Sequence, residues 1–169
     1  MAYSDPFSFT IDAVWDALEA NSDFTTLVPT QNRIKLDSGF KPFKSTLMES
    51  SVPEVQILPG GKRFEENPCS GLSIVQILNI ALSTGVRNTS KLLPLEWRII
   101  QAIYTAINQS SGHFASLSWQ STEIIKSVLF QPLDEGLTYD ELSRELKGWA
   151  AIMPIEVKLH LPNGLLGLE

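Results

Sequence analysis

The feature that most constrains the fold is an arrangement that occurs twice: an amphipathic helix followed by two strand-like segments. Apolar residues recur at the same helical offsets in both halves of the chain. They are Phe7, Ile11, Val14, Trp15 and Leu18 in the first half, and Leu95, Ile99, Ala102, Ile103 and Ala106 in the second. This spacing gives each helix one apolar stripe, and the strand-like segments are the obvious cover for both stripes.

Local signals predict where the two helices begin and end. Asp5-Pro6 offers a capping acceptor followed by proline at the first helical position, which predicts a helix to about Asn21. Ser22-Asp23 is expected to cap a further short turn that ends at Pro29. The second main helix is expected from Ser90 to about Asn108, with Pro94 in its first turn.

The second helix carries an additional apolar stripe. This stripe consists of Trp97, Ile100, Tyr104 and Ile107. A helix that is apolar on two sides is expected to be buried on both, so the sequence predicts that the second helix is more buried than the first.

Several segments read as strands. Gln31–Leu36 alternates weakly, and Val55–Leu58 predicts a short strand that ends at a hairpin turn, Pro59-Gly60-Gly61. Leu72–Thr84 alternates most strongly and would span roughly 40 Å, so it is expected to bend or to project toward another subunit. Glu123–Phe130 and Trp149–Leu161 complete the set.

Two features near the second pair of strands carry their own expectations. Pro154 predicts a sheet edge or a bulge inside the last strand. Thr138–Glu141 has the form of a capping box before a short helix containing Leu142 and Leu146.

The elements together predict an α/β (α+β) fold. We expect a two-layer domain with a mostly antiparallel sheet, both main helices on one face, and the order α-β-β-α-β-β. Residues 1–169 are expected to form a single domain with a short C-terminal tail at 162–169. The predicted core consists of Trp15, Leu18, Ile74, Leu78, Ile80, Ile99 and Ile103.

Composition narrows the range of partners. Charged residues make up 19% of the chain, below the roughly 25% of typical domains, which suggests that partners cover part of the surface. A net charge of −6 argues against general affinity for nucleic acid. The single cysteine, Cys69, excludes an internal disulfide and fits a reducing compartment. No secretory signal and no membrane-spanning run is apparent, so synthesis in the cytosol is expected.

No residue pattern predicts catalysis or a cofactor. His113 and His160 are far apart, without the neighbours that a metal site needs. Cys69 lacks a partnered base, and Gly60-Gly61-Lys62 lacks the remaining residues of a phosphate-binding loop. We therefore expect no cofactor, no metal and no enzymatic activity.

Two charged clusters of opposite sign lie in different halves of the chain. The basic cluster contains Arg33, Lys35, Lys41 and Lys44, and the acidic cluster contains Asp134, Glu135, Asp140 and Glu141. A nucleic-acid patch is one interpretation of the basic cluster, and a cation site or a solvated loop is an interpretation of the acidic one. Pairing of the clusters between neighbouring copies explains both, and it is the preferred interpretation.

The order of elements resembles that of the tail terminator proteins of long-tailed bacteriophages. Ile11–Leu18 followed by Asp23-Phe24 and Asn32-Arg33-Ile34 resembles the opening of such proteins. Val52-Pro53-Glu54-Val55 is similar to their first sheet strand, and Gly148-Trp149 before Ile155-Glu156-Val157 is similar to their last.

This resemblance implies a structural protein of the virion neck, made in the host cytoplasm. In that family six copies form a ring that caps the tail tube, ends its polymerisation and offers a surface for joining the head. The implied partners are the chain itself, the tube protein, a neck connector or stopper protein and, in some tails, a sheath. DNA would pass the pore without specific binding. A head-completion or stopper protein and a monomeric binding or chaperone module are the alternatives.

Overall fold

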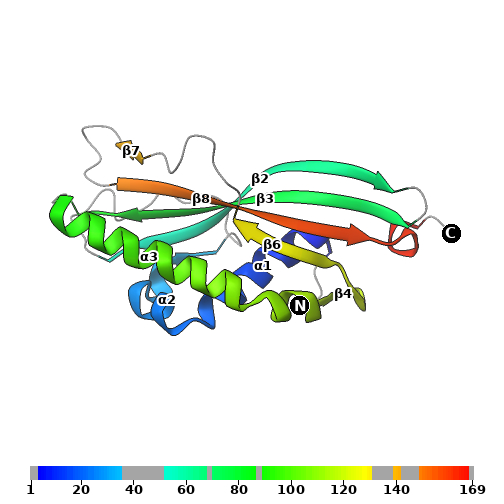
Figure 1. The fold of residues 1–169 in the computed structure, drawn as a ribbon, viewed down its shortest axis with the longest axis horizontal. Helices are drawn as coiled ribbons and strands as arrows, with labels where there is room; N and C mark the ends of the chain where they lie inside the picture. Colours follow the sequence, from blue (N-terminus) through cyan, green and yellow to red (C-terminus); the bar gives the residue numbers. More distant parts are fainter. Residues whose placement is uncertain are drawn as a thin grey trace.

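The helices and the sheet form two layers, as Figure 1 shows for this computed structural model. The structure describes residues 4–35, 52–67, 70–86, 89–130, 139–141 and 149–167. Within them lies a six-stranded sheet, in which β7 (Tyr139–Glu141) pairs with β8 beside the main strand order. That order is β1 (Arg33–Ile34), β2 (Glu54–Asn67), β3 (Gly71–Thr84), β8 (Trp149–Leu161) and β6 (Ile125–Phe130). The β1–β2 pair is parallel and every other pair in this sheet is antiparallel. The predicted α+β class, with a mostly antiparallel sheet and two main helices, is confirmed.

Helix α1 (Pro6–Glu19) begins where the sequence predicts. The Asp5 carboxylate accepts hydrogen bonds from the backbone N–H groups of Phe7 and Ser8 at 2.9 and 2.8 Å. These bonds satisfy two of the donors that a helix start leaves free. Burial by itself would raise the pKa of Asp5. The hydrogen bonds from Ser8 and Phe7 and the charge of Lys62 outweigh it, so the pKa lies below its ordinary value.

Removal of this cap is expected to destabilise the protein in a pH-dependent way. Asp5→Ala should lower the free energy of unfolding by about 1 kcal/mol near neutral pH. A lowered folded-state pKa means that the charged cap stabilises above the ordinary carboxyl pKa, and that this part is lost as the pH falls through the folded value. Urea unfolding of the parent, Asp5→Ala and Asp5→Asn along a falling pH series tests this. The asparagine variant keeps the cap without the charge, and an equal acid response in that variant would contradict the assignment.

A second short helix, α2 (Ser22–Leu27), follows directly. Its cap is Asn21, whose side chain accepts from Phe24 N at 2.9 Å, so the cap lies one residue before the predicted Ser22. A single 3-10 turn, η1 (Thr30–Asn32), leads into the two-residue strand β1 (Arg33–Ile34). Over its described residues, 31–35, the weak alternation of Gln31–Leu36 therefore yields a short edge strand, and Leu36 lies outside the described residues.

The predicted hairpin turn at Pro59-Gly60-Gly61 is wrong. Strand β2 runs through it, from Glu54 to Asn67, and pairs with β3 on both sides. The register shifts between Pro59 and Lys62, which is a β-bulge that accommodates the missing N–H of proline. Glycine is required at position 60, because a Cβ there would lie 2.9 Å from the Ile77 carbonyl oxygen.

Strand β3 (Gly71–Thr84) confirms the strongest strand prediction, but its length has a different cause from the one expected. Both neighbours are equally long: β2 has 14 residues and β8 (Trp149–Leu161) has 13. The β8 register covers Leu72 to Thr84 without a break. The length of β3 is therefore used within the chain and does not by itself indicate pairing with another subunit.

Strand β8 is interior to the sheet, yet the proline in it lies at a local gap. Pro154 pairs with Asn79 of β3 on one side. On the other side, the pairing of β6 (Ile125–Phe130) ends at Ile155, and that of β7 (Tyr139–Glu141) begins at Ala151. Among the described residues the position is thus edge-like, as proline requires. The capping box predicted at Thr138–Glu141 is wrong over 139–141, which form β7. Leu142 and Leu146 lie outside the described residues.

Helix α3 (Thr89–Gln109) contains Pro94 and is followed by α4 (Ser111–Ser116). A small hairpin of β4 (Ser118–Trp119) and β5 (Thr122–Glu123) then leads into β6. Helices α1, α2 and α3 pack against one another over the same face of the sheet. The second main helix therefore joins the same layer as the first.

The core lies between these layers. All seven predicted core residues are buried: Trp15, Leu18, Ile74, Leu78, Ile80, Ile99 and Ile103. They belong to one cluster together with side chains of β2 and β8, such as Ile57 and Val157. One polar pair crosses the layers, because the buried Thr10 hydroxyl and Gln76 carboxamide lie 2.7 Å apart.

Within the predicted C-terminal tail at 162–169, the described residues 162–167 contain a packed turn. The 3-10 turn η3 (Asn163–Leu166) packs Leu165 and Leu166 against the core. Gly71 allows this return, because it has a φ of +127° and a Cβ there would collide with the backbone of Leu161 and Pro162.

Candidate functional site

Arg33, from the predicted basic cluster, is bound within its own chain. Its Nε donates to the Val28 carbonyl at 2.9 Å, and its guanidinium lies 3.6 Å from the Glu19 carboxylate. The guanidinium also lies 5.9 Å from the centre of the Phe24 ring. Its side chain is only 10% exposed, so it joins α1, α2 and β1.

Lys35 pairs with the same carboxylate from a more exposed position. Its Nζ lies 3.0 Å from Glu19 Oε1 and 5.7 Å from the Trp15 ring centre, and its side chain is 44% exposed. The other members of the basic cluster, Lys41 and Lys44, lie outside the described residues. The described half of this cluster therefore holds α1 to the start of the sheet.

The acidic cluster is described only at its strand. Asp140 and Glu141 belong to β7, where they pair with Ala150 and Trp149 of β8. Asp134 and Glu135 lie outside the described residues. Pairing of the acidic cluster with the basic cluster of another copy stays a prediction.

Helix α3 exposes part of the second apolar stripe, which the sequence pattern predicted to be buried. Trp97 and Tyr104 of that stripe are 61% and 55% exposed, and Leu93, which lies outside it, is 56% exposed. Only Ile107 of the predicted second stripe is buried, and Ile100 is half-buried. The stripe was visible in the sequence, but its burial was predicted wrongly: Tyr104 stacks on the Phe130 ring of β6 with 5.2 Å between the ring centres and is still more than half exposed. Helix α1, with fewer exposed residues, is the more buried of the two.

Glu96 lies beside this stripe as a buried carboxylate. It is three residues from Leu93 and four from Ile100, which places it next to both on the helix surface. The residue is 9% exposed, and Oε2 has no hydrogen-bond partner among the described residues. Burial raises its pKa above the ordinary glutamate value. A carboxylate in this setting favours either a proton or a cationic partner.

The C-terminal end of β2 exposes an aromatic side chain and basic side chains, in contrast to the acidic Glu96. Phe64 is 59% exposed, and it pairs with Ile74, so it lies on the sheet face that carries the helices. Lys62 lies on the same face, with its Nζ 4.5 Å from the Phe7 ring centre. On the other face, Arg63 and Lys158 approach Glu65 at 3.5 and 3.8 Å. The sequence reasoning missed this surface, because it ended the strand at Leu58.

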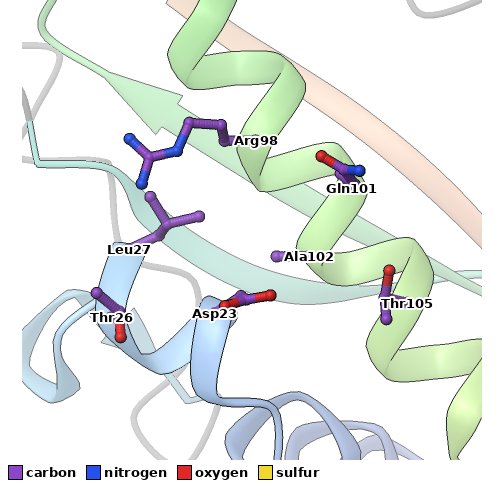
Figure 2. A pocket seen from close by; sticks show the side chains of 7 residues that line it. All are labelled: Asp23, Thr26, Leu27, Arg98, Gln101, Ala102 and Thr105. Carbon is purple, nitrogen blue, oxygen red and sulfur yellow. The ribbon is translucent and has the colours of Figure 1, made fainter.

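A shallow groove of about 340 Å³ runs between α2 and α3. Figure 2 shows Arg98 reaching from α3 toward α2, where Asp23, Thr26 and Leu27 line the opposite wall. Gln101 and Thr105 continue the α3 side. The residues that line the groove are of mixed polarity and include no nucleophile–base pair. The groove is therefore a surface depression between two helices and has no features of a reaction centre.

The histidines occupy separate environments. Nδ1 of His160 lies 3.2 Å from Ser73 Oγ, and Nε2 lies 3.0 Å from the Ser70 carbonyl oxygen, whereas His113 is exposed on α4. Across the described ranges, His, Cys, Asp and Glu nowhere form a group of three able to hold a metal ion. Cys69 lies outside them. None of the helices in the described part is long and apolar enough to cross a membrane.

The geometry thus defines an α+β fold of two layers. Its most prominent surface features are exposed apolar and charged side chains rather than a deep cleft. No protein-family model and no curated protein sequence matches the chain. Its fold is similar to that of a chain in the solved virion of a native gene transfer agent particle. That match has a TM-score of 0.56 and 13% sequence identity, and it covers 89% of this chain and 93% of the other. At this identity the likeness shows a shared fold.

Proposed function

We propose that this chain is a structural component of a phage-like virion, and that it acts in the neck as a ring-forming tail terminator. The observation that carries the proposal is the fold shared with a chain of a gene transfer agent virion over nearly the full length of both. The exposed Trp97 and Phe64 favour a protein that works through contacts, because large exposed apolar groups mark interaction surfaces.

The work of such a ring is mechanical and needs no catalytic group. Six copies would cap the tail tube, stop its growth and present a surface to a neck connector or stopper protein. The negative net charge of −6 suits a pore that DNA passes without binding. Contacts between the Lys41–Lys44 segment and the Asp134–Glu141 segment of neighbouring copies are part of this proposal, while Arg33 and Lys35 act within each copy.

The mass of the purified protein tests the proposal first. We expect a closed oligomer of about six times the 18.8 kDa chain by light scattering, which weakens but survives at high salt because apolar contacts supply most of the affinity. Electron micrographs with the tube protein of the same virion should show shorter tubes with a ring at one end. A monomer at high concentration, with and without tube protein, would contradict the ring and favour a binding or chaperone module. A ring that binds a head connector but never a tube would favour the stopper protein.

A further inference from the structure

We propose that the free edge of β2 pairs antiparallel with the same edge of a second copy, about a two-fold axis that passes through Phe64. This contact goes beyond the proposed ring, because a two-fold contact uses each copy once and gives a dimer. It joins two free copies, or one copy from each of two rings.

Most of the outer edge of β2 has no strand beside it. Strand β1 pairs with Val55 and Gln56, and within the described part of the chain the edge from Ile57 to Asn67 has no strand partner. Residues 61–65 are all exposed, so both faces of the strand reach solvent there. In Figure 1 this half of β2 forms the margin of the sheet, at the end where the C-terminus lies. Such an edge offers a row of backbone N–H and C=O groups to a further strand.

Symmetry limits how two copies of this edge can pair. Residues directly opposite each other in a sheet lie on the same face, so a two-fold axis between antiparallel strands must pass through a residue position. Phe64 lies on the helix face of β2, and Arg63 and Glu65 lie on the other face. With the axis at Phe64, the two Phe64 side chains come opposite each other. Arg63 of each copy then comes opposite Glu65 of the other.

The charges select this register over its neighbours. An axis one residue earlier would place Arg63 opposite Arg63, and an axis one residue later would place Glu65 opposite Glu65. Like charges directly opposite each other destabilise a sheet, whereas aromatic pairs and opposite-charge pairs stabilise it. The axis at Phe64 gives only pairs of the stabilising kinds over positions 62–66, since Lys62 comes opposite Glu66. The edge of β2 is therefore self-complementary in a single register.

The three central side chains are accessible in the single copy. Arg63 Nε lies 3.5 Å from Glu65 Oε1, yet the two side chains are 66% and 44% exposed. Exposed pairs of this kind are weak, and in the dimer each charge gains an opposite charge across the axis. Phe64 is 59% exposed, so contact between the two rings removes apolar surface from water. Lys62 already lies 4.5 Å from the Phe7 ring centre, and the register is selected without it.

Cysteine cross-linking tests the position of the axis. In a Cys69→Ser background, Phe64→Cys alone should give a disulfide-linked dimer and nothing larger. Residues directly opposite have Cα atoms about 4.5–5.5 Å apart, which is within the range of a disulfide. Arg63→Cys alone should link little, whereas a mixture of Arg63→Cys and Glu65→Cys chains should form a dimer. Leu129→Cys, at a residue that is 57% exposed on β6, is the matched control for chance collisions and should form none.

Charge reversal tests the register without new cysteines. Arg63→Glu and Glu65→Arg should each weaken dimerisation by about tenfold, because each places like charges opposite each other. The two substitutions together restore opposite charges in the same register, so the double variant should dimerise nearly as well as the parent. Lys158→Met removes an exposed lysine beside Glu65 on the same sheet face and is the control, with little change expected. Sedimentation velocity over a concentration series measures the dimer dissociation constant.

The outcomes for this contact and for the ring are separate. Phe64→Cys that links no better than Leu129→Cys, or a double charge variant that is as weak as the single variants, overturns the β2 contact. An intact ring in that case leaves the proposed function standing. A Phe64→Cys dimer in a protein that forms no larger assembly supports the β2 contact and contradicts the ring.

Discussion

Ile103→Ala is expected to lower the free energy of unfolding by about 2–5 kcal/mol, because it opens a cavity where helix and sheet meet. Ile103 is fully buried in α3 and belongs to the main core cluster. It sits between two packed layers, so neighbouring side chains can close the space only in part. Denaturant unfolding at one fixed protein concentration measures the loss and keeps any contribution of assembly constant.

Two further substitutions in α3 serve as reference variants for this experiment. Ile103→Val should cost about 0.5–1.5 kcal/mol, since it removes a single methyl group. Gln101→Ala, at an exposed position of the same helix, should stay within about 0.5 kcal/mol of the parent. If Ile103→Ala has the same free energy of unfolding as Gln101→Ala, the face of α3 that meets the sheet has been assigned wrongly.

Arg33→Met is expected to lower the free energy of unfolding by about 2–3 kcal/mol. A loss of this size indicates that Arg33 stabilises its own chain, whereas a residue that acts only in assembly would show a smaller one. The substitution keeps much of the apolar stem but removes the donor to the Val28 carbonyl and the charge beside Glu19. Hydrogen bonds to charged groups contribute about 1.5–3 kcal/mol, and the last carbonyls of a helix such as α2 have no donors within the helix itself. The loss should appear in unfolding of the parent and variant at the same concentration.

Lys35→Met is the matched control, because both cations contact the same carboxylate. Its side chain is 44% exposed, so water screens the pair and the expected cost is at most about 1 kcal/mol. Added salt should reduce the Lys35 contribution more than that of Arg33. Equal costs for the two substitutions would mean that Arg33 is solvated, and its place as a link between α1, α2 and β1 would then be wrong.

The fold was largely predictable because its signals are local. Asp5-Pro6 begins α1 as expected, and β8 has the predicted bounds Trp149–Leu161. Capping depends on two or three neighbouring residues, and alternation depends on adjacent positions, so both can be recognised without knowledge of distant contacts. The buried face of each main helix followed from the same kind of pattern.

The candidate surfaces were less predictable, since exposure depends on what lies beside an element. Trp97 and Tyr104 have the spacing of a buried stripe, yet both are more than half exposed, although Tyr104 stacks on the Phe130 ring of β6 with 5.2 Å between the ring centres. Arg33 belongs to a basic run in the sequence, yet its partners Glu19 and Val28 come from α1 and the end of α2. A linear pattern carries no information on such pairings.

Local patterns in the sequence were enough to predict the two-layer class, the start of α1 and the core faces, because capping and periodicity act over a few residues. The tertiary structure alone decided that β2 runs through Pro59-Gly60-Gly61, since a bulge forms only when β3 supplies a partner on both sides. It likewise decided that Glu96 is buried without a partner for Oε2 in the described chain, because burial is set by the packing of whole elements. Local chemistry thus specified the elements, and packing specified which of their surfaces remain available for contact.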